Sequence, residues 1–148
     1  MKATELLKAD HRNVFDLMNQ LRAAGKRDAL LLQRIYDSLK VHTQCEEEIF
    51  YPAMQPMNPD EIQRARTAHN EIDDLLEELM AIRIQKGMVV FFEVLNNLEQ
   101  KLRQHVEEEE GKIFPEAEER LKGNLEEMGN RIEEYKIDLR TTNYGMAA

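Results

Sequence analysis

The chain carries two histidine–glutamate pairs with the same spacing. His42 precedes Glu46 by four residues, and His105 precedes Glu109 by four residues. A helix places residues four apart on one face, so each pair directs an imidazole and a carboxylate to the same point. Imidazole and carboxylate donors suit iron, manganese or zinc, and the chain has no cysteine pairs of the kind that hold structural zinc.

A further histidine precedes each pair, His11 the first and His69 the second. A single helical histidine is more often a surface or core residue, but this two-copy pattern favours a metal site. We predict a two-metal centre in which His11 and His42 bind one metal, and His69 and His105 bind the other.

The two glutamates of the pairs, Glu46 and Glu109, come from opposite halves of the chain and can each span both metals. A buried charge is costly unless it is paired or metal-bound, so a metal-free cluster of this kind is disfavoured. Glu47 and Glu110 follow these glutamates, about 100° further round a helix, where we expect solvated or supporting acids.

Four long helices must position these donors. Helical spacing of apolar residues predicts them at Thr4 to Ala24, Asp28 to about Phe50, Asn58 to about Gln85, and Met88 to about Glu110. Pro52 and Pro115 are expected to end the second and fourth helices, because proline disfavours helix just before it. Short connections imply antiparallel neighbours. The predicted fold class is all-α, an up-down-up-down antiparallel four-helix bundle with a short C-terminal fifth helix.

The C-terminal region has its own helical pattern. Apolar residues recur at steps of three and four, at Leu125, Met128, Ile132, Tyr135 and Leu139. We expect a bundle over residues 1–122, an amphipathic helix over 123–140 and a frayed tail over 141–148. The helix is expected to dock on the bundle, and a homodimer or protein-partner contact is the alternative.

Composition excludes several classes of function. The 148 residues carry a formal net charge of −9, which disfavours binding to nucleic acid or to anionic membranes. Apolar runs fall short of the roughly 18 residues of a membrane span, and the N-terminus lacks the apolar core of a signal peptide. The single cysteine, Cys45, cannot form an internal disulfide. We therefore expect a cytoplasmic protein.

The order H…HxxxE…H…HxxxE over about residues 8 to 118 resembles the hemerythrin-like (HHE cation-binding) family. It is carried by His11, the H-T-Q-C-E-E of residues 42–47, His69, and the H-V-E-E-E-E of residues 105–110. The resemblance implies an up-down-up-down bundle that holds two non-heme iron ions in a carboxylate-bridged, oxo- or hydroxo-bridged centre. It also implies a centre that meets oxygen, nitric oxide or peroxide, in sensing, detoxification or repair of iron centres.

One position departs from the oxygen-carrying members, whose third helix bears a second histidine four residues after the first. Here that residue is Asp73, and the equivalent position in the first half is Phe15. Asp73 is either a fifth ligand on the metal of His69 and His105, or it holds a bound water or leaves an open position. Each arrangement favours redox reaction over reversible oxygen binding. An oxygen-storage or carrier protein, or an iron-sensing or storage module, is the alternative, and whether the protein is an enzyme stays open.

Two residues near the first pair have packing roles in this interpretation. Tyr51 is expected in the core or against a loop, with a hydrogen bond or electron donation at the site as the alternative. Cys45 is expected as a small buried apolar residue, with a redox-sensitive thiol as the alternative.

Overall fold

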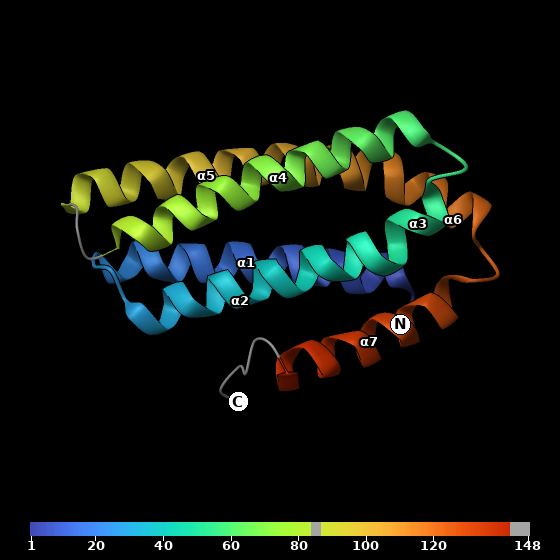
Figure 1. The fold of residues 1–148 in the computed structure, drawn as a ribbon, viewed down its shortest axis with the longest axis horizontal. Coiled ribbons are helices and arrows are strands. Elements are labelled where there is room, and N and C mark those ends of the chain that lie inside the picture. The colour runs from blue at the N-terminus through green and yellow to red at the C-terminus, as the bar shows by residue number, and fades with distance from the viewer. Residues whose placement is uncertain (84–86, 143–148) are drawn as a thin grey trace.

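The structure is a computed structural model that describes residues 1–83 and 87–142, and within these ranges every regular element is a helix. The long helices are α1 (Ala3–Ala24), α2 (Ala29–Cys45), α4 (Pro59–Ile82) and α5 (Met88–Glu108). They lie lengthwise beside one another, and α1 packs on α2 while α4 packs on α5 (Figure 1). The predicted all-α class and helical bundle are confirmed. No helix in the described ranges is long and apolar enough to cross a membrane.

Local signals in the sequence explain where helices begin and end. Gly25 ends α1 with a left-handed φ of 64°, and the Asp28 side chain caps α2 by accepting two backbone hydrogen bonds of 3.1 Å. The first helix was predicted to begin at Thr4, but α1 begins one residue earlier at Ala3, and the Thr4 hydroxyl donates to Glu118 at 2.9 Å. The predicted end of the third helix, Gln85, lies outside the described residues.

The predicted helix ends at Pro52 and Pro115 are wrong. Each helix instead passes through a π-helical turn, η1 (Glu46–Phe50) or η2 (Glu109–Ile113), and continues as α3 (Tyr51–Met54) or α6 (Phe114–Arg120). Proline lacks an N–H and clashes with the carbonyl four residues before it in a regular α-helix. The wider turn spaces the bonds five residues apart, with Tyr51 N–H donating to Glu46 O, and so accommodates the proline. Both wide turns begin at the glutamate of a pair.

The apolar core is divided into two clusters by the layer that contains the histidines. One cluster contains Leu7, Phe50, Met54 and Phe114, and the other contains Val14, Met18, Phe91 and Leu98. Along α1, Leu7 and Val14 lie on either side of His11 and belong to different clusters. The histidine layer is therefore held between two apolar regions that exclude water.

The C-terminal helix α7 (Leu125–Thr142) packs along the outside of α1 and α2 (Figure 1). Its buried apolar residues are Leu125, Met128, Ile132 and Leu139. The predicted docking on the bundle is confirmed, and the helix includes Thr141 and Thr142, which we expected in the tail. Gly129 is required at the contact with the N-terminus, since a Cβ there would overlap the carbonyl oxygen of Met1.

Candidate metal centre

The structure brings six predicted donors from both halves of the bundle into two adjoining groups. The first donor group consists of His11, His42, Glu46 and Glu109, and the second donor group consists of Glu46, His69, His105 and Glu109. Within each group the donor atoms all lie within 4.8 Å of one another, and all six residues are buried. Glu46 and Glu109 belong to both groups, so each brings its carboxylate close to histidines of both halves.

Several buried polar atoms in this layer are left without a hydrogen-bond partner among the described residues. They are Glu46 Oε2, Glu109 Oε1 and His105 Nε2; of these, Glu109 Oε1 lies 3.2 Å from His11 Nε2, and His105 Nε2 lies 3.5 Å from Glu109 Oε2. An unpaired buried carboxylate oxygen is costly, and cations compensate it directly. Nitrogen and carboxylate oxygen donors are the set that iron, manganese and zinc accept. The residues present therefore fit two metal ions.

The electrostatics of the metal-free layer also indicate a demand for positive charge. Burial opposes protonation of His42 and His69, but the surrounding carboxylates outweigh it and raise their pKa values to about 10 and about 9. Burial likewise opposes ionisation of Glu46, yet His42 and His69 hold its pKa well below the usual range. For His105 burial prevails and lowers the pKa to about 4. Protons on His42 and His69 thus take the place of cations beside the shared carboxylates.

Three of the histidines are oriented by carboxylates behind them. Each Nδ1 donates to a carboxylate oxygen, in the pairs His11–Glu110 at 2.7 Å, His42–Asp10 at 2.9 Å and His69–Glu47 at 2.6 Å. Such contacts fix the ring and leave Nε2 facing the centre. Glu47 and Glu110 thus support the histidines. Sequence analysis missed Asp10, although its position next to His11 in α1 could have suggested it.

Tyr51 is part of the site. Its hydroxyl donates to Glu109 Oε2 at 2.5 Å and lies 3.1 Å from His69 Nε2, and its ring stacks on that of His69 at 5.2 Å. Burial and the nearby carboxylates raise the pKa of this phenol well above its usual value. Phe114, its counterpart in the second half, stacks on His11 without a hydroxyl. The expected packing role was incomplete, and this repeat comparison could have revealed the difference.

Cys45 lies next to the site in sequence but fits the expected packing role. Its side chain is fully buried in the apolar cluster that includes Phe50 and Met54. Burial raises the pKa of its thiol to about 12, which keeps the thiolate scarce.

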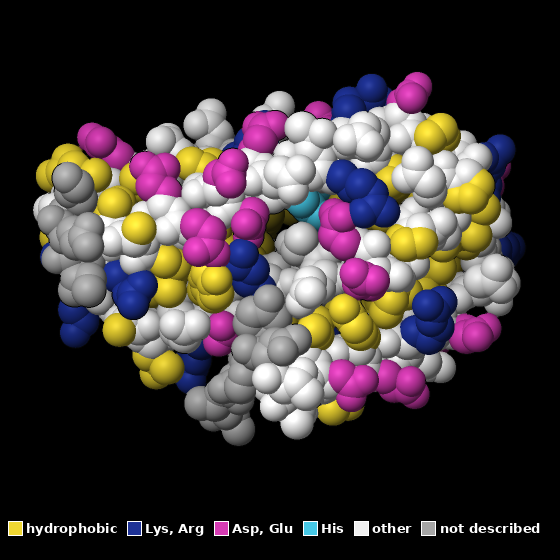
Figure 2. Space-filling view, in the orientation of Figure 1, with side chains coloured by type: hydrophobic (Ala, Val, Ile, Leu, Met, Phe, Trp, Pro, Cys, Tyr) yellow, Lys and Arg dark blue, Asp and Glu magenta, His cyan; other side chains and the backbone are white. Residues whose placement is uncertain are grey.

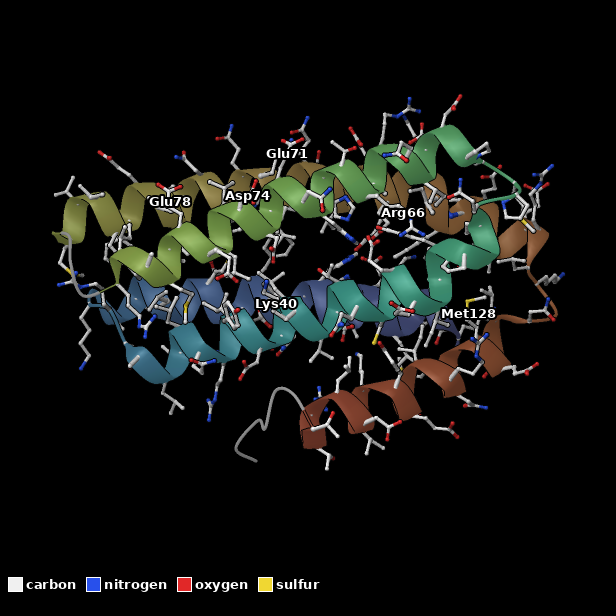
Figure 3. The ribbon with its side chains drawn as sticks, viewed as in Figure 1. Lys40, Arg66, Glu71, Asp74, Glu78 and Met128 are labelled. Carbon is white, nitrogen blue, oxygen red and sulfur yellow. The ribbon has the colours of Figure 1, made fainter. Side chains whose placement is uncertain are left out.

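Asp73 is not brought into either donor group. It forms an ion pair with Lys40, which also pairs with Glu77 at 2.9 Å, and its side chain is 46% exposed. Figure 3 shows Lys40 on α2 facing the space between α2 and α4. Asp73 and Lys40 line a cavity of about 10 Å³ that reaches His69, with Thr43 beside them. That volume is close to the room one water molecule requires.

The second donor group is approached from two sides. Figure 2 shows a hollow on this face of the molecule with a histidine visible in it, and the cavity at His69 opens between α2 and α4. A larger depression of about 240 Å³ between α4 and α5 is lined by His105, Gln63, Glu71 and Lys101. Both cavities border histidines of the second donor group, and a cavity of about 20 Å³ borders His42 of the first.

A buried layer of histidines and shared carboxylates inside a helical bundle defines a metal-binding class of protein. The family model for the Hemerythrin HHE cation binding domain matches residues 2–117, so the chain belongs to the hemerythrin family. The family predicted from the histidine–glutamate motifs is confirmed. No curated protein and no solved structure matches the chain. Helix α7 lies beyond the matched residues.

Proposed function

We propose that the protein binds two non-heme iron ions, and that this centre binds or reacts with oxygen, nitric oxide or peroxide. The observation that carries the proposal is the sharing of Glu46 and Glu109 between the two donor groups. The proposed centre has carboxylate bridges and an oxo or hydroxo bridge, in an up-down-up-down bundle of the family type. Its uses would be sensing, detoxification or repair of iron centres.

Bound iron would supply redox chemistry and open positions for a small ligand. The chain itself supplies orientation, exclusion of water and a hydrogen-bond donor. Glu47 and Glu110 hold the rings of His69 and His11, and the apolar clusters enclose the layer. Tyr51 keeps its proton at Oη beside His69, because its pKa is raised. A ligand at the second donor group would thus meet a neutral phenol that can donate a hydrogen bond.

Reaction is favoured over reversible oxygen carriage by the position of Asp73. This residue replaces the second histidine of the oxygen carriers, and in the structure its carboxylate pairs with Lys40. The second donor group therefore has one histidine fewer than a carrier provides. A stable oxygenated spectrum that reverses on cycling oxygen would instead support the carrier alternative.

An iron-sensing module is the second candidate, favoured by the buried Glu46 Oε2, which accepts no hydrogen bond from the described residues. A fold that depends on metal to satisfy this atom would loosen when iron is removed. Limited proteolysis with and without chelator tests it. Sensing predicts a large gain in cleavage within the bundle helices α1, α2, α4 and α5 after chelation, whereas equal cleavage of these helices in both forms would leave the reactive centre as the function.

The test of the proposed function is the iron content of the purified full-length protein together with its near-ultraviolet and visible absorption spectrum. We expect two irons per chain and charge-transfer bands that bleach on reduction. Addition of oxygen, nitric oxide or peroxide to the reduced protein should then change the spectrum, and the fastest reaction would identify the preferred ligand. One metal, zinc, or no response to any of the three would contradict the proposal.

A further inference from the structure

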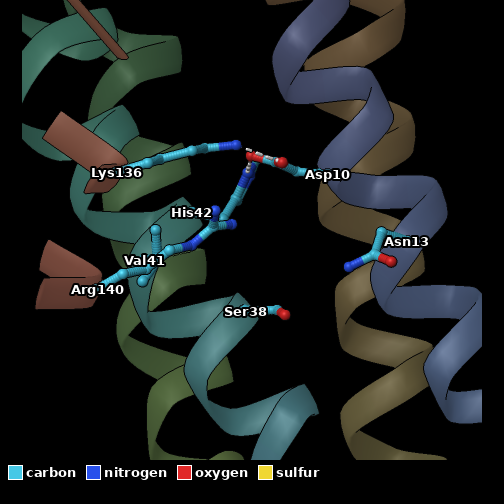
Figure 4. Close-up of a pocket in the computed structure, with 7 residues that line it drawn as sticks. All are labelled: Asp10, Asn13, Ser38, Val41, His42, Lys136 and Arg140. Atoms are coloured by element: carbon cyan, nitrogen blue, oxygen red, sulfur yellow. Dashed lines mark hydrogen bonds and ion pairs between the residues drawn. The ribbon is translucent and has the colours of Figure 1, made fainter. Parts of the chain in front are cut away.

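Helix α7 reaches the metal centre although it lies beyond the residues that match the family. Lys136 Nζ on this helix donates to Asp10 Oδ1 at 2.5 Å, and His42 Nδ1 donates to Asp10 Oδ2 at 2.9 Å. Figure 4 shows the three side chains meeting at the carboxylate of Asp10, with Lys136 approaching from α7. A continuous chain of polar contacts therefore links α7 to one of the predicted metal ligands.

The Lys136–Asp10 contact is largely buried, and the helix that carries Lys136 is held in place by apolar residues. Lys136 is 12% exposed and Asp10 is 20% exposed, which is unusual for charged groups on the outer side of a bundle. The helix that carries Lys136 is held by Ile132 and Leu139, which are buried on either side of it. Each oxygen of Asp10 has its own partner, so the orientation of the carboxylate depends on both α7 and His42.

The orientation of Asp10 matters because it decides where His42 points. With Nδ1 turned to Asp10, His42 Nε2 lies 3.0 Å from Glu46 Oε1 and 3.2 Å from His11 Nε2, within the first donor group. Partners behind a metal-binding histidine typically change metal affinity by about 10- to 100-fold when they are removed. A change at Lys136 would therefore reach the metal through two short contacts.

The second half of the chain has no carboxylate at the position equivalent to Asp10. When His11 is aligned with His69, the residue that matches Asp10 is Ala68, which offers no carboxylate to His105. Helix α7 packs on α1 and α2, the helices that supply the first donor group. An effect that passes through α7 should therefore be confined to one of the two metals.

We propose that α7 forms part of the metal centre, with Lys136 as a positioning residue that acts through Asp10 to hold His42 and so strengthens metal binding at the first donor group. The inference rests on the proposed binding of two irons. Because coupling between two binding events is reciprocal, metal at the first donor group should in turn strengthen the docking of α7.

The test compares iron release from the iron-loaded full-length protein and three variants after addition of a chelator. Lys136→Met should release one of its two irons about tenfold faster than the parent protein, while the other leaves at the parent rate. Lys136→Arg keeps the cation and should restore most of the slow release. Arg131→Met, which removes an exposed cation from the same helix, is the matched control and should behave as the parent.

A second readout does not depend on release. Limited proteolysis within α7 should be slower in the iron-loaded parent than in the metal-free parent, and this protection should be lost in Lys136→Met. Melting of the metal-free proteins, followed by circular dichroism, establishes that each variant folds. If Lys136→Met does not fold, Asp10→Asn, which keeps Lys136, should show the same selective release of one iron.

The outcomes separate this inference from the proposed function. A parent protein that binds no iron contradicts the proposed function itself. A parent with two irons whose Lys136→Met or Asp10→Asn form releases both at the parent rate overturns the role of α7 alone. Equal acceleration of both irons would also overturn it, because the effect would then be a general loosening of the bundle.

Discussion

The first donor group lies beside α7, whereas the second donor group borders the larger depression between α4 and α5. Behind the first, His42 and Lys136 both contact Asp10, and the three residues line a cavity of about 20 Å³. Beside the second, cavities of about 10 and 240 Å³ reach His69 and His105. Both groups offer the same donor types, so the difference lies in the residues around them. We propose that the first, which is tied to α7 through Lys136, is the firmly held position, and that a small ligand reacts at the second, beside the larger depression.

The same comparison extends to individual pairs of equivalent residues. Tyr51 offers a hydroxyl where Phe114 offers none, and Asp10 offers a carboxylate where Ala68 offers none. The two halves of the bundle therefore share their ligand residues but differ at neighbouring positions. These differences would give the two metals different surroundings. Variants at the shared and at the divergent residues test whether the two positions differ as proposed.

The largest effect is expected from a shared carboxylate. Glu109→Ala removes a donor from both groups and should lower iron content from two per chain to less than one, whereas His42→Ala removes a donor from one group and should leave one iron. Metal analysis of the purified variants measures this. Glu108→Ala, an exposed neighbour of the shared residue, is the control and should retain two irons. Two irons in Glu109→Ala would refute the shared site.

The equivalent histidines His42 and His105 should have pKa values shifted in opposite directions from the usual value in the metal-free protein. The pKa of His42 is raised to about 10, so its contribution to stability is present below about 6.5 and is lost as pH rises toward 10. The pKa of His105 is lowered to about 4, so stability from that residue is lost as pH falls from about 6.5 toward 4. Nuclear magnetic resonance of the imidazoles measures both, and equal pKa values would contradict the asymmetry.

Iron loading should release protons, because two of the histidine ligands have raised pKa values. At neutral pH the metal-free protein carries a proton on His42 and another on His69, whose pKa is raised to about 9. Metal ligation requires neutral imidazole, so binding should displace about two protons and should weaken as pH falls. Calorimetry in buffers of different ionisation enthalpy counts them. Binding without proton release would show that the shared carboxylates do not hold protons in place of metal.

A smaller effect is expected from Tyr51→Phe, which makes the two halves alike at this position. Loss of the hydroxyl leaves Glu109 Oε2 without its donor and should destabilise the metal-free protein by about 1–3 kcal/mol. Chemical denaturation measures the free energy of unfolding. Iron content should stay at two, but reaction with peroxide or oxygen should slow if the phenol donates a hydrogen bond to the ligand. Phe114→Tyr is the matched variant and should leave that rate unchanged.

The smallest effect is expected from Asp73→Asn. Its ion pair with Lys40 is partly exposed, and such pairs contribute about 0–1 kcal/mol. Two irons should be retained, with at most a change in the rate at which small ligands reach the second donor group. Loss of one iron in this variant would show that Asp73 binds the metal directly.

The sequence was sufficient where a periodic pattern carried the information. The i, i+4 spacing of His42 and Glu46 depends only on helix geometry, and the same holds for the apolar stripe that docks α7. The sequence was insufficient at the prolines, where the tendency of proline to end an α-helix had to be weighed against a π-turn that accommodates it. Pro52 ends an ordinary helix, but the π-turn that begins at Glu46 lets the helix continue.

Long-range contacts were the other limit. Asp10 and Lys136 are 126 residues apart, and neither belongs to a repeated pattern, so their contact could be identified only from the folded chain. Tyr51 was underestimated because its hydroxyl partner, Glu109, comes from the other half of the bundle. The role of Asp73 depended on Lys40, which lies on a different helix.

The most direct test of the central claim is anomalous diffraction at the iron absorption edge from crystals of the iron-loaded protein. The account predicts two strong peaks on either side of the shared Glu46 and Glu109, one next to His11 and His42 and the other next to His69 and His105. A single peak, or peaks away from this histidine layer, would contradict the two-iron centre.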